Sequence, residues 1–479
     1  MPREPMPTFI HELPLVVTPR DERVLHVRLH AVRQVYNATL GEGLRRMDRL
    51  RESKAWRDAR RQSRGKQRNE ALIALRNEVG LSDYDPWKAI EAHLHGKRGR
   101  PRFKSARRFH SVEGKSNAAG IRFREGRVAW KGLMIPVRID HKDKHGVEAH
   151  ALSCKVKYVR LVRRTVNKRS RWFAQLIVEG SPWQKPGNPV AHGQEVGLDI
   201  GPSTLAAVGE DDAFLTRFCD EVAPLGREIR RIQRAMDRSR RATNPDNYHP
   251  DGAVKKGPKR WVNSKRYLAL RAELAERQRR LAQTRKHAHG RMANRVLALG
   301  DLVKMESLSY MGFQKNFGKS ARDRAPGMFV ERLRRKAANA GGWTEEFPTG
   351  PTKLSQTCVC ATVRKKRLSV RWHHCECGVS AQRDLFSAFL ARHVEKCRLS
   401  IPRAQAAWGG AEPLLGRAME RLEQTASGSG SVPASFGLPE YRRWSRSSAK
   451  GESAVIEAGD AVGARLRSPR APERWQPCP

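Results

Sequence analysis

The chain lacks any long apolar segment. No run of about 18 or more apolar residues occurs in its 479 residues, which excludes a hydrophobic helix long enough to cross a bilayer. Residues 1–17 contain Pro, His and Glu where a secretory signal needs a continuous apolar stretch. We therefore expect neither a membrane span nor a signal peptide.

Several easily recognised enzyme motifs are also missing. The chain has no glycine-rich phosphate-binding loop of Walker type, no H-E-x-x-H pair among its 16 histidines and no Ser/His/Asp signature. These absences leave an NTPase, or a hydrolase with a catalytic triad, without support.

Acidic residues are scarce relative to basic ones. The chain has 49 Asp and Glu against 94 Lys and Arg, a formal net charge of +45 and a pI near 11.0. Such a chain repels itself unless a polyanion neutralises it, and nucleic acid is the usual polyanion. A ribosomal or chromatin protein has the same sign of charge, so charge alone predicts the partner and not an enzyme.

The eight cysteines are unevenly distributed. Four of them lie between residues 358 and 377, and the other four are scattered over the chain. This distribution is typical of a metal site in a reducing compartment rather than of a disulfide framework. We therefore expect a cytoplasmic protein.

Apolar periodicity divides the first 190 residues. Residues 9–19 predict a strand, and helical spacing over 20–45 predicts a helix. Short alternating runs between residues 120 and 180 predict a small β-barrel or sheet. The Pro- and Gly-rich stretch 182–189 predicts a linker, after which a new domain starts near Gln194.

Basic and low-complexity segments follow. Residues 227–241 and 264–299 predict two basic helices within the second domain. Beyond about residue 400 the chain is rich in Ala, Gly, Ser, Pro and Arg, which predicts a largely disordered tail. We expect removal of residues 425–479 to leave activity intact.

Clusters of Arg and Lys are the candidate contacts with nucleic acid. Between residues 44 and 68 the alternative is a solvated helix face, but few acidic residues interleave, which favours a surface for the phosphate backbone. The candidate residues over the whole chain are Arg45, Arg49, Arg60, Arg61, Arg102, Lys104, Arg230, Arg231, Arg234, Lys265, Arg266 and Arg371.

Three carboxylates lie in short apolar frames: Asp199, Glu306 and Asp384. The alternation around Asp199 and Glu306 predicts strands, and burial of a carboxylate in such a strand is costly unless it is paired or bound to a cation. Separated carboxylates brought together by folding are what a nuclease needs to hold Mg²⁺. The three together predict such a site.

Each carboxylate alone has an ordinary explanation. Asp199 can cap a turn with Ser203, and Glu306 can lie on an exposed edge strand. Asp384 falls in the first turn of a predicted helix with Ser380 as its N-cap, where a negative charge favours the helix dipole.

The clustered cysteines form two C-x-C pairs: Cys358, Cys360, Cys375 and Cys377. Four thiolates in two close pairs suit tetrahedral Zn²⁺. Each pair has one residue fewer between its cysteines than a usual zinc knuckle. Unmetallated thiols are therefore an alternative, and His373 or His374 is an alternative ligand.

A series of short segments occurs in order over about residues 9–400. They are R-Q-V-Y-N-A-T-L at 33–40, P-R-F-K-S at 101–105, G-L-D-I-G at 197–201, a basic helix ending at 287–299, M-E-S-L at 305–308, K-L-S-Q-T-C at 353–358, L-S-V-R at 368–371 with the second cysteine pair, and R-D at 383–384. This ordered series resembles the transposon-encoded TnpB nucleases and the related compact type V CRISPR effectors.

The resemblance implies a multidomain α+β, bilobed effector. Its implied parts are a wedge-type β-barrel from residues 1–19 and 111–185, a helical recognition lobe from 20–110, an RNase H-like (RuvC) nuclease from 190–349 and 381–400 with a basic helical insert, a zinc-ribbon-like, Cys-rich element for target nucleic acid from 350–380, and a largely disordered tail from 401–479.

The activity implied by the resemblance is RNA-guided DNA cleavage. A guide RNA pairs with double-stranded target DNA beside a short flanking motif that the protein reads. Asp199 would bridge two Mg²⁺ ions, with Glu306 and Asp384 each completing one site, for two-metal hydrolysis of the phosphodiester. Zn²⁺ at the four cysteines is the second implied cofactor.

Three alternatives follow from the same resemblance. A prokaryotic CRISPR defence effector is favoured over a transposon-encoded guided nuclease, and a guided DNA-binding protein that silences without cutting is the third. The chain departs from the family at Gln382 and Phe386, where Asp and Asn are usual. A monomer is favoured over a dimer.

Overall fold

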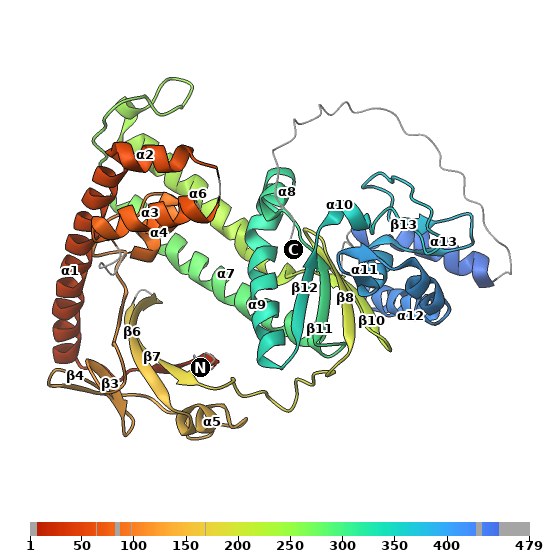
Figure 1. Cartoon of the computed structure of the whole chain (residues 1–479), viewed down its shortest axis with the longest axis horizontal. Helices are drawn as coiled ribbons and strands as arrows, with labels where there is room; N and C mark the ends of the chain where they lie inside the picture. The colour runs from red at the N-terminus through yellow and green to blue at the C-terminus, as the bar shows by residue number, and fades with distance from the viewer. Residues whose placement is uncertain are drawn as a thin grey trace. The chain divides into compact units, whose positions relative to one another are not determined.

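The computed structural model describes residues 7–63, 65–81, 87–96, 98–167, 169–427 and 434–449 (Figure 1). The chain divides into two compact units. Unit 1 comprises Met1–Gly193, Cys219–Asp301 and Tyr310–Thr344, and unit 2 comprises Gln194–Phe218, Leu302–Ser309 and Glu345–Pro479. Unit 2 thus begins at the predicted domain start. Within the described ranges no helix is both long and apolar enough to span a membrane.

Two small sheets open unit 1 and share one core. One is antiparallel with the order β1-β7-β6-β2, and the other has the order β3-β4-β5. Their strands are β1 (Thr8–Pro14), β2 (Ser111–Glu113), β3 (Ile121–Arg124), β4 (Arg127–Trp130), β5 (Leu133–Pro136), β6 (Val156–Val166) and β7 (Arg169–Glu179), with helix α5 (Val147–Ser153) between β5 and β6. The strand predicted over residues 9–19 is confirmed over 9–14 and ends before the helix that begins at Pro19. The sheet within 120–180 is confirmed, and closure into a barrel stays a prediction.

Helix α1 (Pro19–Glu52) belongs to two cores. It begins with a capping box between Thr18 and Asp21, which satisfies the free N–H groups of its first turn. Leu25 and Leu29 pack into the sheet core, whereas Leu40 and Met47 pack with the following short helices. Those helices are α2 (Lys54–Arg61), α3 (Lys66–Glu78) and α4 (Trp87–Leu94). The helix expected over 20–45 is confirmed and is longer.

Two of the ordered sequence segments are hydrogen-bonded to each other. Asn37 accepts a hydrogen bond from the backbone N–H of Lys104 (2.8 Å) and donates one to its carbonyl (3.0 Å). Arg33 donates to the same carbonyl at 3.3 Å. The segments at 33–40 and 101–105 therefore fix the return of the chain from the helices to the sheet.

The rest of unit 1 is helical. The basic segments predicted over 227–241 and 264–299 are confirmed as helices α6 and α7, which pack along each other. The helices are α6 (Ala223–Thr243), α7 (Lys265–Leu297), α8 (Tyr310–Arg324) and α9 (Pro326–Asn339), with the short 3₁₀ turns η2 (Asp220–Val222) and η3 (Pro245–Asn247). These helices cluster with unit 1 and not with the strands of unit 2 that flank them in sequence.

A buried histidine in this bundle makes unit 1 sensitive to acid. His289 is 2 % exposed, donates from Nε2 to the carbonyl of Arg324 (2.8 Å) and lies edge-on to Phe329. Burial lowers the pKa of His289 to about 4 from its usual 6.5. The unfolded chain therefore binds more protons between these two values, and stability present above pH 6.5 is lost as pH falls toward 4.

We expect His289 alone to cost about 2 kcal/mol of unfolding free energy between pH 7 and pH 5, since one pKa unit corresponds to ~1.4 kcal/mol. Urea unfolding followed by circular dichroism at both pH values measures this loss. His289→Gln, which keeps a neutral N–H donor, should lose about 2 kcal/mol less than the wild type on acidification. An equal loss in both proteins would show that protonation of His289 does not cause the loss of stability in acid.

Unit 2 is built on a five-stranded sheet of order β10-β9-β8-β11-β12. β9 is antiparallel to both β10 and β8, and β11 is parallel to β8. The strands are β8 (Glu195–Ile200), β9 (Thr204–Val208), β10 (Ala213–Arg217), β11 (Leu302–Glu306) and β12 (Trp343–Phe347). The strands predicted around Asp199 and Glu306 are therefore confirmed.

Small elements carry the second half of unit 2. They are α10 (Thr349–Thr352), the hairpin of β13 (Trp372–His374) and β14 (Ser380–Gln382), helix α11 (Arg383–Arg392), and the pair β15 (Val394–Glu395) and β16 (Arg398–Leu399). Helix α11 covers the sheet at β8, β9 and β11. Its buried apolar residues, among them Leu385 and Phe389, form the centre of the unit's core.

The prediction of a disordered tail from residue 401 is wrong for most of its length. Residues Ile401–Ser427 form α12, and Ala434–Phe436 (η4) and Leu438–Ala449 (α13) follow. Leu414, Leu415 and Met419 are buried against the sheet core, so an apolar stripe is present despite the many small residues. Residues 450–479 lie outside the described residues.

Candidate active site and cysteine cluster

Asp199 lies at the end of β8 on the face that helix α11 covers. Val196, Leu198 and Ile200 point to the other face and are buried, as the strand period requires. On the α11 face, a Cβ on Gly197 would come within 1.9 Å of the carbonyl oxygen of Ala388. Only glycine permits this approach, so the G-L-D sequence brings the helix directly onto the strand that carries Asp199.

Asp384 is carried to Asp199 by this packing. Asp384, Ala388 and Arg392 are four residues apart and share one stripe of α11. Moving from Ala388 to Asp384 covers about 6 Å of helix, and moving from Gly197 to Asp199 covers about 7 Å of strand. The two carboxylates therefore lie at the same end of the sheet.

Glu306 reaches the same place through the sheet. The parallel register pairs Met305 with Leu198, so Glu306 is next to Asp199 at the ends of adjacent strands. Lys304, on the same face of β11, is buried and donates to the carbonyl of Arg392, which confirms that this face lies under α11. β11 is an interior strand, so the alternative of an exposed edge-strand Glu is excluded.

Gln382, not Ser380, is the N-cap of α11. Its side-chain oxygen accepts a hydrogen bond from the N–H of Leu385 (2.8 Å), while Ser380 lies in β14. Asp384 is in the first turn as predicted, and Thr204 donates to it at 3.4 Å. The departure at Gln382 thus fills a capping position. Phe386 stacks on His373 in the core and makes no part of the carboxylate site.

The Asp384 and Glu306 carboxylates disfavour a negative charge on Asp199. The pKa of Asp199 is raised well above its usual value by burial, then by the neighbouring Asp384 and Glu306 carboxylates. Burial raises the pKa of Glu306 to about 7, although a hydrogen bond from Thr352 partly opposes this rise. Burial also raises the pKa of Asp384, while the cations Arg383 and Arg371 oppose the shift. A bound cation would relieve this repulsion, and carboxylate oxygens are the ligands that Mg²⁺ prefers.

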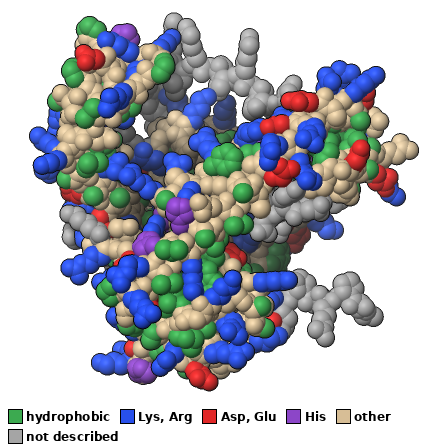
Figure 2. Space-filling view, turned by 90° about the vertical axis from the view of Figure 1, so that its left-hand side faces the viewer, with side chains coloured by type: hydrophobic (Ala, Val, Ile, Leu, Met, Phe, Trp, Pro, Cys, Tyr) green, Lys and Arg blue, Asp and Glu red, His purple; other side chains and the backbone are tan. Residues whose placement is uncertain are grey.

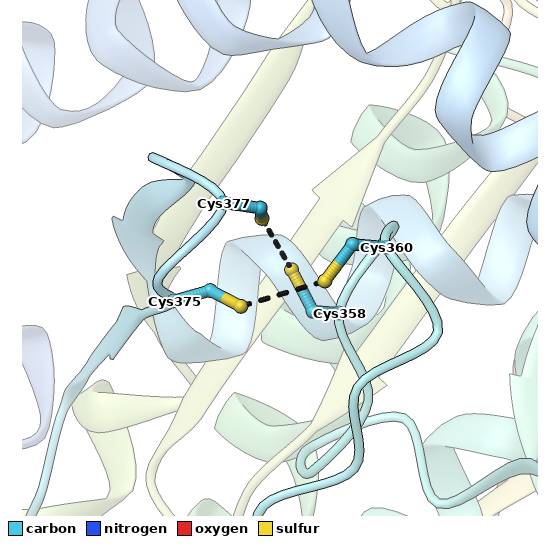
Figure 3. Close-up of side chains that lie close together, drawn as sticks. All are labelled: Cys358, Cys360, Cys375 and Cys377. Atoms are coloured by element: carbon cyan, nitrogen blue, oxygen red, sulfur yellow. Dashed lines mark hydrogen bonds between the residues drawn. The ribbon is translucent and has the colours of Figure 1, made fainter.

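The four clustered cysteines converge at a single point. Among the described residues they are the one group of three or more His, Cys, Asp or Glu side chains whose ligand atoms all lie within 4.8 Å of one another. Figure 3 shows each turn contributing one sulfur to each close contact: Cys358 to Cys377 at 3.6 Å and Cys360 to Cys375 at 3.5 Å. Sulfurs bound to one tetrahedral Zn²⁺ at ~2.3 Å lie about 3.8 Å apart, so the cluster fits this ion.

Both C-x-C pairs lie in turns of the same kind. The N–H of Cys358 bonds to the carbonyl of Thr362 and that of Cys375 to the carbonyl of Val379, at 2.9 and 3.0 Å. The third residue after each leading cysteine, Ala361 or Gly378, has a positive φ. The shortened spacing is thus accommodated by two matching tight turns. His373 is held away from the cluster against Phe386.

The candidate nucleic-acid contacts are distributed over both units. Arg45 and Arg49 lie on α1, Arg60 and Arg61 on α2, Arg102 and Lys104 in the segment after α4, Arg230, Arg231 and Arg234 on α6, Lys265 and Arg266 at the start of α7, and Arg371 just before β13. Arg230 and Arg371 are half-buried and the others are exposed. Lys and Arg outnumber acidic side chains on the face shown in Figure 2. On α6 the arginines line a shallow groove of about 390 Å³.

The C-terminal helices contact the segment that positions Asp384. Trp372 of β13 donates to the carbonyl of Gly437 (2.9 Å) and stacks on Tyr441 of α13. Gln382, the cap of α11, donates to the carbonyl of Ser435 at 3.3 Å. These contacts were not predictable from local pattern, because the Ser- and Gly-rich stretch before them is typical of a disordered linker.

A chain that ends at Ser427 is therefore expected to lose cleavage, contrary to the expectation from sequence. This truncation removes the buried side chains of Phe436, Leu438 and Tyr441 and exposes the residues they pack against. Burial of the three side chains stabilises unit 2 by about 5 kcal/mol, at ~1.5–3 kcal/mol per side chain. A chain that ends at Ala449 keeps these contacts and is the matched control. Thermal unfolding and cleavage of both chains test this, and equal behaviour of the two would contradict it.

The similarity of this chain to known proteins is one of structure. No family model matches the chain, and no curated protein matches it. Among solved structures it is similar to a Cas12f1–sgRNA–target DNA complex, with TM-score 0.44 and 10 % identity over 80 % of this chain and 98 % of that chain. It is also similar to a CRISPR-Cas12f ternary complex, with TM-score 0.27 and 13 % identity over 79 % and 83 %.

Both neighbours are structures of the compact type V effector class that the sequence resembles. Neither TM-score reaches 0.5, and we therefore base the function of this chain on its own residues.

Proposed function

We propose that this chain is an RNA-guided DNA endonuclease whose catalytic residues are Asp199, Glu306 and Asp384. The observation that carries this proposal is the convergence of the three carboxylates from β8, β11 and α11 at one end of the sheet. Three converging carboxylates in a chain of net charge +45 are suited to cation-assisted chemistry on a polyanion.

The residues around the carboxylates orient them. Thr204 donates to Asp384, Thr352 donates to Glu306, and Gln382 caps the helix that carries Asp384. Arg383 donates to the carbonyls of Arg367 and Val370, which fixes the loop before β13 beside the site. The carboxylates of Asp384 and Glu306 both raise the pKa of Asp199, and we therefore assign Asp199 as the ligand shared by the metal ions.

Two metals fit the residues present. Mg²⁺ bound by Asp199, Glu306 and Asp384 would supply activation of water and neutralisation of charge on the scissile phosphate. Zn²⁺ bound by Cys358, Cys360, Cys375 and Cys377 would hold the two tight turns together without taking part in the chemistry.

Guidance by RNA is supported by the ordered sequence segments and by charge, not by the carboxylates themselves. The arginine groove on α6 and the exposed cations of α1 and α2 provide the phosphate contacts that a heteroduplex requires. A CRISPR defence role is favoured, with a transposon-encoded nuclease and a guided DNA-binding protein as the alternatives.

The test is cleavage of a guide-matched plasmid library with randomised flanks, in Mg²⁺, by protein purified with its RNA. We expect cleavage of matched plasmids only, next to a shared flanking motif, and none after the guide is changed. Guide-dependent binding without cleavage would instead identify a guided DNA-binding protein. If the protein shows neither guide-dependent binding nor cleavage, RNA guidance is refuted.

A further inference from the structure

A cleft lies within unit 1, and none of the three carboxylates lines it. Its volume is about 510 Å³, which is within the range of ligand pockets. It is formed by the segment between β7 and β8, by α7 and by α9, and its lining includes Trp183, Lys286, Arg291, Arg332 and Lys336. All of these residues belong to unit 1.

Hydrogen bonds between amides hold the wall of the cleft in place. Asn294 of α7 donates to the side-chain oxygen of Asn188 (2.7 Å), and Gln184 donates to the carbonyl of Asn188 (3.1 Å). Lys336 of α9 donates to the side-chain oxygen of Asn294. The segment predicted as a linker over 182–189 is therefore anchored to α7, which is bonded in turn to α9.

Arg291 of the cleft pairs with Glu221, but the charges of Arg332 and Lys336 have no acidic partner among the described residues. None of the described residues that line the cleft is acidic. Arg332 and Lys336, one turn apart on α9, are half-buried, and no ion pair of either residue occurs in the described chain. The Nε of Arg332 is buried without a hydrogen-bond partner. Burial lowers the pKa of both groups, and Arg332 lowers that of Lys336 further. An anion placed here would remove this cost.

The cleft also presents an aromatic ring. Trp183 lines it and remains 43 % exposed. One side of the residue is held by α5, where the ring lies 5.3 Å from that of His150 and close to Gly146. An exposed, fixed aromatic ring beside unbalanced cations is the combination that binds an unpaired base together with its phosphate.

We infer that this cleft binds one unpaired nucleotide, with its base on Trp183 and its phosphate on Arg332 and Lys336. The inference rests on the proposed function only for the source of the nucleotide, which is either the RNA or a displaced DNA strand. The chemistry recognised is the same in both cases.

Five-nucleotide single-stranded RNA and DNA probes with a central 5-iodouridine or 5-iododeoxyuridine test the inference. Their affinities for the full chain are measured by fluorescence anisotropy at several salt concentrations, and the photo-crosslinked residue is identified by mass spectrometry. The variants are Trp183→Ala, Trp183→Phe and Arg332→Gln. The matched controls are Trp343→Ala, at another half-exposed tryptophan, and Arg334→Gln, on the outer side of α9.

We expect the crosslink at Trp183 and a five- to 150-fold weaker affinity for Trp183→Ala, with the salt dependence unchanged and partial recovery in Trp183→Phe. Arg332→Gln should weaken binding and reduce the salt slope by about 0.7, the value for one phosphate contact on a single strand. Tighter binding of the RNA probe would assign the nucleotide to the RNA, and tighter binding of the DNA probe to the displaced strand.

Crosslinks elsewhere, with Trp183→Ala and Arg332→Gln binding like their controls, would overturn the inference. Plasmid cleavage is scored separately in the same proteins. If the cleft variants bind the probes like the wild type and the protein cleaves plasmid, the inference about the cleft is refuted and the proposed nuclease is not. If the cleft variants lose probe binding but the wild type never cleaves plasmid, the proposed nuclease is refuted and the inference about the cleft is supported.

Discussion

Asp199→Asn is expected to slow cleavage of guide-matched DNA by about 10³-fold or more, because it removes the residue that we propose as the shared metal ligand, an effect of several kcal/mol on the transition state. Affinity for the same DNA should stay within about threefold, since guide pairing and distant cations supply it. Single-turnover cleavage and filter binding measure the two quantities. Asp211→Asn, an exposed change in the turn between β9 and β10, is the matched control.

The same variant separates a catalytic role from a structural one. Neutralising Asp199 relieves repulsion with Asp384 and Glu306, so the metal-free variant should unfold at the same or a higher temperature than the wild type. The wild type should gain stability on addition of Mg²⁺ and the variant should not. A variant that is less stable without Mg²⁺, and that still responds to it, would show that Asp199 supports the fold instead.

Cys358→Ser is expected to remove about one Zn²⁺ per chain and to destabilise unit 2 by several kcal/mol, since a structural zinc contributes its binding energy to folding. The turns at 358–362 and 375–379 precede Gln382 and Asp384, so cleavage should fall as well. Elemental analysis, thermal unfolding and cleavage together measure the effect. Cys397→Ser, in the same unit but outside the cluster, is the control. Zinc content and stability equal to the control would show that the cluster holds no structural zinc.

The individual elements of the carboxylate site were predictable from local pattern. Alternating apolar residues around Asp199 and Glu306 predicted strands, and the first turn of a helix was predicted at Asp384. Their convergence was not predictable from pattern alone. It depends on the parallel pairing of β8 with β11 and on the contact of Gly197 with Ala388, which joins positions 191 residues apart in sequence. The resemblance to a known family predicted the grouping without giving this cause.

The errors arose where composition and packing disagree. Small residues dominate 401–427, yet Leu414, Leu415 and Met419 recur with helical spacing and bury one side of α12. Ser380 has the chemistry of an N-cap but pairs in β14, and Gln382 caps the helix instead. The unbalanced cations of the cleft at Arg332 gave no signal in sequence, because charge balance depends on which side chains meet after folding.

The most direct test of the central claim, that Asp199 and Asp384 act in one catalytic centre, is the single-turnover cleavage rate of Asp199→Asn, Asp384→Asn and the double variant on a guide-matched plasmid in Mg²⁺. When two residues act as one catalytic unit, the first substitution removes nearly all of their joint contribution to the rate, and the second substitution removes little more. We predict that the double variant cleaves within about threefold of the slower single variant. Losses that multiply in the double variant, or a single variant that cleaves like the wild type, would contradict the account.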